Sequence, residues 1–245
     1  MRRQLPGPPR PRERGDCRQE LATALAYDAL VTDEGDAAAR LTLADWRRRI
    51  ADLYGEVRGL AVADPAVARE LWRDEREALY RTHPQSPVPA AERATFGGRY
   101  WPYDPTFRFV VEVRAGGAEA AIKVAPILPV SLGTTLDFSR VGEVEIPFLA
   151  GRRTLGLFWM AGYAGGLFLP FRDATNGSAT YGAGRYLLDT AKGADLGGDA
   201  ATGRLVLDFN FAYQPSCAFD PRWSCPLAPP ENRLDIPIEA GERIA

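Results

Sequence analysis

Short apolar segments separated by glycine-rich breaks fill the chain from Phe107 onward, where the spacing of apolar residues stops being helical. Several short strands with turn residues between them are typical of an antiparallel barrel or sandwich, whereas alternating strands and helices would indicate a parallel sheet. The sequence therefore predicts an α+β fold that is mainly β, with N-terminal α-helices. The predicted strands are FRFVVEVRA, EAAIKVA, VGEVEIPFL, RTLGLFWMA, GLFLPF, RYLLD and RLVLDFNF.

Two further segments are interpreted from their prolines. The proline-rich stretch Ala125–Leu132 is predicted to be a loop between strands. The segment LDIPIEAGERI near the C-terminus is predicted to be a closing strand. Pro237 within it indicates an edge position, because proline cannot donate to the ladder of a sheet.

The first of two predicted helices begins near Thr42. Thr42 and Asp45, three residues apart, resemble a capping box, in which side chains bond the free N–H groups of a helix start. A weaker helical pattern spans residues 19–31. The apolar residues that share one face of the first helix are Trp46, Ile50, Leu53, Tyr54 and Val57.

The second predicted helix follows Asp64, which suits the N-cap position, with Pro65 at the first helical position. It is expected to end near Thr82, because His83 precedes a proline and such residues avoid the helical conformation. Its predicted apolar face consists of Val67, Leu71, Ala78 and Leu79.

Charge is concentrated at the N-terminus of a chain whose formal net charge is only -2. Residues 1–18 hold six arginines against Glu13 and Asp16, with four interleaved prolines, so this segment is predicted to be a disordered tail. The near-neutral balance gives no global reason to bind nucleic acid or an anionic membrane. The domain prediction is a tail over residues 1–18, a helical region over 19–82 and a β domain over 83–245.

The hydrophobic pattern predicts neither a signal peptide nor a membrane helix, since no uninterrupted run of about 18 apolar residues occurs. We therefore expect a cytoplasmic protein. Its three cysteines, Cys17, Cys217 and Cys225, do not form a disulfide framework.

Polar residues embedded in apolar surroundings are densest between Phe171 and Asn232. If this region contains a strand over LVLDFNF, Asp208 and Asn210 share one face of it. Burying them would cost several kcal/mol without partners, and Arg185 is the expected partner because its planar fork matches a carboxylate. The same group could serve a site or only fix the closure of the barrel. The embedded polar residues are Asp173, Arg185, Asp208, Asn210, Asp220, Glu231 and Asn232.

Cys217 and Cys225 lie in a proline-rich loop and have three interpretations. Cys217 is a nucleophile candidate if His83, the single histidine of the chain, serves as its base. The two cysteines with His83 would give three zinc ligands, but their spacing matches no zinc motif. Structural roles, as buried thiols or a local disulfide, are favoured because free cysteines are commonly buried.

Aromatic residues and a stiff segment accompany this polar group. Four aromatics are candidates to line a pocket for a flat or apolar ligand, or to serve as core residues. The run PLAPPEN would hold Glu231 and Asn232 in a fixed place against the sheet. The four aromatics are Tyr181, Tyr186, Tyr213 and Trp223.

The segments GLFLPFRDATNG, TYGAGRYLLDTAKGADLG, LDFNFAY and PSCAFDPRWSCPLAPPENRL, with the terminal AGE, resemble the domain of unknown function 1684. HPQSP and FGGRYWPYDP resemble it too, so the resemblance spans most of residues 83–242. It implies a mostly β domain behind N-terminal helices, without an established substrate. Ala179 stands where the family pattern usually has Glu, and Gln214 where it usually has Asn.

The leading functional hypothesis is an enzyme that acts on a small molecule by acid–base chemistry in a β-barrel pocket, without a redox cofactor or a metal. In it, Asp173 and Asp208 are acid–base candidates, Arg185 is an anion clamp, and Asn210 and Tyr213 orient the ligand. The alternatives are a non-catalytic module that binds a small ligand, and a scaffold. Hydrolysis, isomerisation and cyclisation remain open, as does the oligomeric state. No nucleic-acid or membrane partner is expected.

Overall fold

The computed structural model describes residues 37–115, 127–129, 135–161 and 165–244. The predicted tail, the predicted helix over residues 19–31, Cys17 and the predicted strand EAAIKVA lie outside these residues. Residues 36–245 group into one compact unit.

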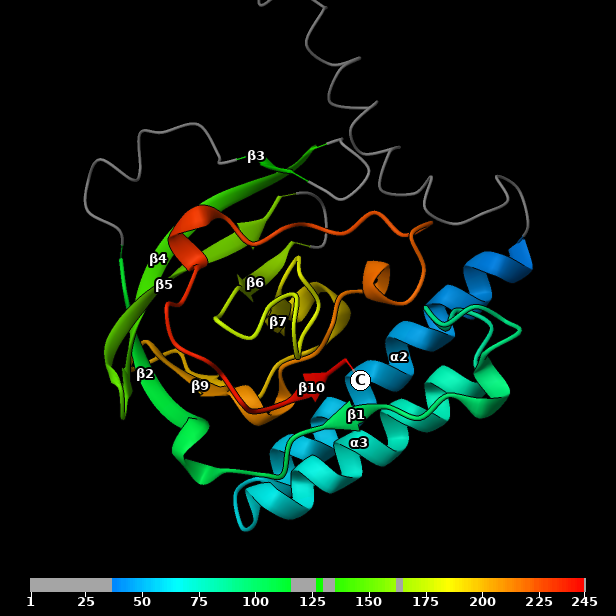
Figure 1. Cartoon of the computed structure of the whole chain (residues 1–245), viewed down its shortest axis with the longest axis horizontal. Helices are drawn as coiled ribbons and strands as arrows, with labels where there is room; N and C mark the ends of the chain where they lie inside the picture. Colours follow the sequence, from blue (N-terminus) through cyan, green and yellow to red (C-terminus); the bar gives the residue numbers. More distant parts are fainter. Residues whose placement is uncertain (1–36, 116–126, 130–134, 162–164, 245) are drawn as a thin grey trace, which may run out of the picture. The chain divides into compact units, whose positions relative to one another are not determined.

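The main sheet is antiparallel and curls into a half-barrel, in the order β7-β6-β5-β4-β2-β9-β8 (Figure 1). The short strand β3 (Ile127–Pro129) pairs with β4. This confirms the predicted fold class, α+β and mainly β, with the sheet closed only part of the way to a barrel. The strands are β2 (Arg108–Arg114), β4 (Thr135–Phe148), β5 (Gly151–Met160), β6 (Gly166–Phe171), β7 (Arg185–Asp189), β8 (Gly198–Asp199) and β9 (Arg204–Asp208).

Alternation of side chains fixes which face of the long strands is buried. In β4, Val144, Ile146 and Phe148 are buried, while Glu145 and Pro147 between them are more exposed. This is the period of two expected for a strand with one face on a core. Ile146 and its neighbours join a core that also holds Leu234 and Ile238 from the C-terminal chain. In Figure 1 that chain, orange to red, runs inside the curve of the sheet.

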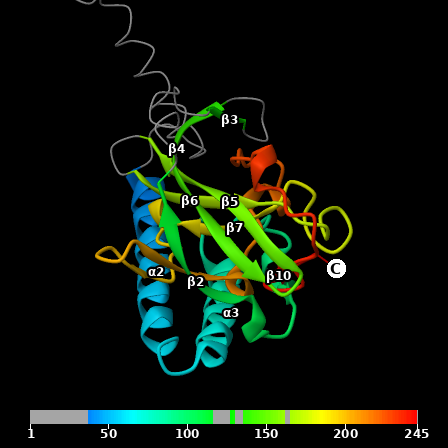
Figure 2. The same cartoon turned by 90° about the vertical axis from the view of Figure 1, so that its left-hand side faces the viewer.

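Two helices, α2 (Ala37–Leu60) and α3 (Pro65–Thr82), pack together beside the sheet (Figures 1 and 2). The predicted start and end of α3 are confirmed: the Asp64 carboxylate accepts from two N–H groups of the first turn, and His83 is the extended C-cap. The capping box predicted at Thr42 is wrong, because α2 begins at Ala37 and the Thr42 hydroxyl donates inside the helix to the carbonyl of Ala39.

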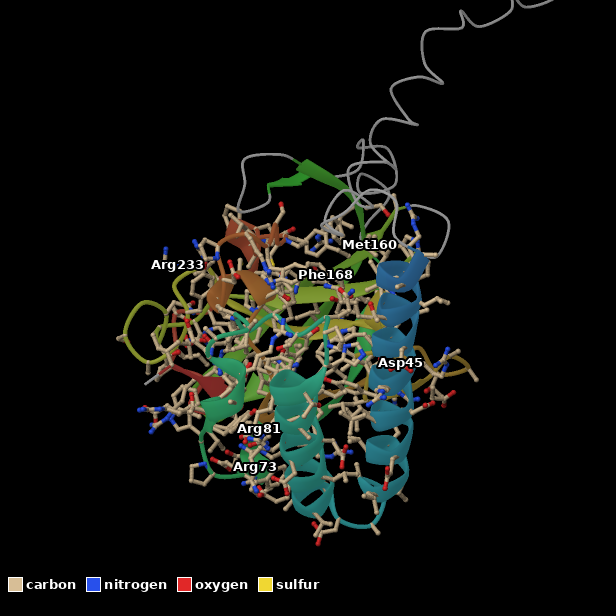
Figure 3. The ribbon with its side chains drawn as sticks, turned by 90° about the vertical axis from the view of Figure 1, so that its right-hand side faces the viewer. Asp45, Arg73, Arg81, Met160, Phe168 and Arg233 are labelled. Carbon is tan, nitrogen blue, oxygen red and sulfur yellow. The ribbon has the colours of Figure 1, made fainter. Side chains whose placement is uncertain are left out.

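A second core lies between the helices and the sheet. The buried face of α2 is as predicted at Ile50, Leu53, Tyr54 and Val57. The predicted face of α3 is confirmed at Leu79, and Leu71 packs against this core, but Val67 is 52% exposed. In Figure 3, which views the helix pair, Phe168 and Met160 of the sheet lie level with the first turns of α2. The buried face of α3 consists of Ala68, Arg69, Trp72, Arg76, Leu79 and Tyr80.

Three predicted elements near the C-terminal half differ from the structure. The strand RLVLDFNF ends at Asp208, and residues Phe209–Phe211 form the 3₁₀ turn η4 instead. The closing strand LDIPIEAGERI is reduced to β10 (Glu242–Arg243), which pairs with β1 (Arg99–Tyr100). The proline-rich stretch predicted as a loop contains β3. Among the described residues, no helix is long and apolar enough to cross a membrane.

Candidate functional site

Arg185 and Asp173 form a buried ion pair, and both side chains are 0% exposed. The guanidinium donates to the Asp173 carboxylate at 2.9 Å and to the backbone carbonyls of Ile238, Ala240 and Glu242. The other oxygen of Asp173 accepts from the amide and hydroxyl of Thr175. Burial lowers the pKa of Arg185, although Asp173 opposes that change. This cluster therefore holds the C-terminal chain against β7. Both terminal nitrogens of the guanidinium donate to protein groups, whereas its Nε is buried without a partner among the described residues.

Asp208 and Asn210 form a second, separate cluster. The prediction that Arg185 is their partner is wrong, because the cation beside Asp208 is Arg108, at 3.2 Å. Asp208 caps the turn η4 by accepting from the backbone and side-chain amides of Asn210. Asn210 in turn bonds both backbone groups of Asp104. The turn η4 brings the Asn210 side chain to the segment that contains Asp104, whereas a continued strand would point it elsewhere.

Burial raises the pKa of Asp208, although the bonds from Asn210 and the charge of Arg108 favour the ionised form. Because the folded-state pKa lies above the unfolded value of about 4, the contribution of this group to stability falls as pH rises from about 4. We expect Asp208→Asn, which cannot titrate, to gain stability relative to the wild type between about pH 4 and pH 7. Urea unfolding at both pH values measures this. A difference that is constant, or that moves the other way, would contradict it.

Asn232 bridges the point where β5 and β6 diverge. Its side chain accepts from the N–H of Gly156 at 2.7 Å and donates to the carbonyls of Gly156 and Pro170 at 2.9 and 2.7 Å. Regular pairing of β5 with β6 stops at Phe158, two residues away, so Asn232 takes the place of the missing ladder bonds. Its neighbour Glu231 is exposed and faces Arg140 at 3.3 Å.

The cysteines and His83 occupy different places in the fold. Cys217 and Cys225 are buried and in contact, with the Cys217 N–H donating to the Cys225 sulfur at 3.3 Å. The bond to Cys217, together with burial, raises the pKa of Cys225, which disfavours its thiolate. Burial and the contact with Cys217 raise the pKa of Tyr181 to about 12. Within the described part of the chain, no group of three His, Cys, Asp or Glu side chains could hold a metal ion.

Both ring nitrogens of His83 have partners, and one of them joins the end of α3 to α2. Nδ1 accepts from the Gln85 N–H at 3.0 Å, so Nε2 carries the proton and faces Asp45 of α2 at 3.3 Å. Trp223, another predicted ligand-binding residue, donates from its indole to the Pro87 carbonyl. These contacts place both residues in the packing of the HPQSP segment.

A cavity of about 60 Å³ lies between α2, α3 and the sheet, and we call it the aromatic cavity. Tyr186 and Tyr213, two predicted pocket residues, both line it, and their rings meet edge to face at 5.8 Å. Burial raises the pKa of both well above the usual range, so both phenols stay protonated. The cavity is lined by Trp46, Ile50, Leu53, Tyr54, Trp72, Arg76, Tyr80, Tyr186, Lys192, Ala194, Tyr213, Gln214, Pro215 and Ser216.

Arg76 and Gln214 are the polar residues buried in this aromatic wall. The Arg76 guanidinium stacks on the rings of Tyr80 and Tyr213, at 4.4 and 4.7 Å, and pairs with Glu242 at 3.2 Å. Burial opposes the charge of Arg76, but Tyr80 and Glu242 outweigh it and raise its pKa. Arg76 Nε and the side-chain oxygen of Gln214 are buried without a hydrogen-bond partner among the described residues.

Sequence reasoning missed Arg76 and did not assign a role to Gln214. The signal for Arg76 was its position on α3: Trp72, Arg76, Leu79 and Tyr80 are three to four residues apart, so Arg76 lies on the buried face of the helix. Gln214 was singled out only as a departure from the family pattern. Ala179, the other departure, is half-buried and its carbonyl accepts from Ile244.

Comparisons with known proteins agree with this architecture. The family model described as "Protein of unknown function (DUF1684)" matches residues 95–243. The solution NMR structure of an uncharacterised protein from Haloarcula marismortui is 32% identical, with a TM-score of 0.51, and the match covers 70% of this chain and 90% of that one. A search of curated proteins finds no match. Gln214 and Glu242 lie inside the matched family region, whereas α3 and Arg76 precede it.

Proposed function

This chain belongs to DUF1684, a family of proteins of unknown function, and we propose that it is a small-ligand-binding module whose site is the aromatic cavity. The proposal includes a cytoplasmic location and a small-molecule partner. A mostly apolar hollow with a few convergent polar groups is the usual form of such sites.

The observation that carries the proposal is a pair of unpartnered polar atoms in two residues that line the cavity. Buried polar groups are almost always hydrogen-bonded, and each that is not costs about 1–3 kcal/mol. Arg76 Nε and the Gln214 oxygen are both such groups and both residues line one cavity. A ligand that supplies the missing partners would remove this cost on binding.

The acid–base enzyme hypothesis has less support. Asp173 and Asp208, its proposed acid and base, are enclosed by Arg185 and Thr175 in one cluster and by Asn210 and Arg108 in the other. A general acid or base must come within hydrogen-bond reach of its substrate. Their contacts instead favour a role in holding the fold.

A fragment screen by ligand-observed NMR on the full chain tests the proposed function. Fragments that bind the wild type should lose binding in Ser216→Phe, because the larger side chain fills the aromatic cavity from its wall. Ser224→Phe is the matched control: Ser224 is also half-buried in this loop but does not line the cavity. Loss of binding in both variants, or in neither, would count against the cavity as the site.

A further inference from the structure

Glu242 brings the two unpartnered groups of the aromatic cavity together. One oxygen of its carboxylate accepts from the Arg76 guanidinium at 3.2 Å and from the backbone N–H of Gln214 at 2.7 Å. Arg76 comes from α3 and Gln214 from the chain after η4, so this shared oxygen fixes both beside one cavity wall. Both residues are at least nine-tenths buried, at 6% and 4% exposed.

One of the two unpartnered groups is a hydrogen-bond donor and the other is an acceptor. Arg76 Nε is a donor, because every guanidinium nitrogen of arginine only donates. The Gln214 side-chain oxygen is an acceptor. A ligand group that satisfies both must therefore present an acceptor and a donor.

The charges on the cavity wall and the volume of the cavity further limit the chemical class of the ligand. The two cations of the wall are already paired, Arg76 with Glu242 and Lys192 with Asp189. The acceptor oxygen of Gln214 also disfavours an anion beside it. No Asp or Glu is among the described residues that line the cavity, so a cationic group would lack a counter-ion there. A cavity of about 60 Å³ holds only a few heavy atoms, since an engineered cavity that admits benzene measures about 150 Å³.

We propose that the aromatic cavity binds the primary carboxamide end of a ligand. The amide carbonyl accepts from Arg76 Nε, its NH₂ group donates to the Gln214 oxygen, and its flat face lies against the aromatic wall. This inference rests on the proposed function and names the ligand class for the same site.

The test compares three small probes by chemical-shift titration of the wild-type full chain: acetamide, N,N-dimethylacetamide and acetate. Acetamide should bind with a dissociation constant on the order of 1–10 mM, as expected for so few atoms. The other two should bind at least about fivefold more weakly, because one lacks N–H donors and the other is an anion without a donor. Equal binding of all three would overturn the carboxamide assignment.

The variant Gln214→Met distinguishes the hydrogen bond that Gln214 accepts from the packing of its side chain. Gln214→Met keeps the length of the side chain but removes the acceptor, so it should weaken acetamide at least about fivefold and abolish the preference over the dimethyl probe. The matched control is Gln85→Met, since Gln85 bonds Thr42 and Ala39 away from the cavity and its loss should leave acetamide binding unchanged. Acetamide that binds Gln214→Met as tightly as the wild type would overturn the assignment.

The outcomes also distinguish this inference from the proposed function. If other fragments bind in a way that Ser216→Phe blocks but acetamide does not bind at 50 mM (about five times the weakest expected constant), the carboxamide assignment fails and the binding module stands. If no fragment of any class depends on the cavity, both fail, and ordered water alone satisfies Arg76 and Gln214.

Discussion

Replacing Arg185 with methionine is expected to lower the free energy of unfolding by about 3–5 kcal/mol, which is a large part of the total for a protein of this size. The change leaves the Asp173 carboxylate buried without its cation. It also removes the donors for the carbonyls of Ile238, Ala240 and Glu242, which fasten the C-terminal chain to β7. Urea unfolding of the variant and the wild type measures the loss.

The matched control is Arg153→Met, which removes an arginine that pairs with the exposed Asp235. An exposed ion pair contributes little, so this variant should unfold close to the wild type. Adding Asp173→Asn to Arg185→Met should recover part of the loss, because the stranded charge is then gone. A loss below about 1 kcal/mol in Arg185→Met would show that the pair does not hold the fold.

Helices and strands were predicted well from the sequence where capping residues, prolines and apolar alternation agreed with the packing. Asp64 and Pro65 define the start of α3, and the proline after His83 defines its end, so both bounds follow from backbone chemistry alone. The strands with clear alternation, such as β4, were also predictable. Prediction failed after Asp208, where the apolar–polar alternation continues but the Asp208 side chain bonds the backbone of Asn210 and turns the chain.

The candidate site was predictable only in part, because its residues come from distant segments. Tyr186 and Tyr213 were identified from the density of aromatics, and the cavity does contain them. Arg76 was not identified, because a charged residue is seldom buried, yet it pairs with Glu242 and stacks on two aromatic rings. The partner of Arg185 was misassigned because sequence spacing does not show which of two aspartates the curled sheet brings to it.

Asn232→Leu is expected to lower the free energy of unfolding by about 3–5 kcal/mol, from the cost of leaving three buried groups unpartnered. Those groups are the N–H and carbonyl of Gly156 and the carbonyl of Pro170, which the asparagine now satisfies. Leucine has the same number and branching of side-chain heavy atoms and is no smaller, so the effect should come from lost hydrogen bonds rather than from a cavity. Urea unfolding measures the total, and hydrogen exchange of the Gly156 amide should speed up locally.

The adjacent Glu231→Gln serves as control, because Glu231 is exposed and its loss of charge should change neither unfolding nor the Gly156 amide. Unchanged protection of the Gly156 amide from exchange in Asn232→Leu would contradict the bridging role.

The need to satisfy such backbone groups also explains why polar residues are dense between Phe171 and Asn232. After η4 the described chain forms short turns and the two-residue strand β10, so side chains such as Asn232 and Arg185 must satisfy backbone groups that a ladder would otherwise satisfy. Polar density in this region therefore reflects how an irregular chain is fastened inside a half-barrel, and the proposed ligand site lies beside it, on the helix face.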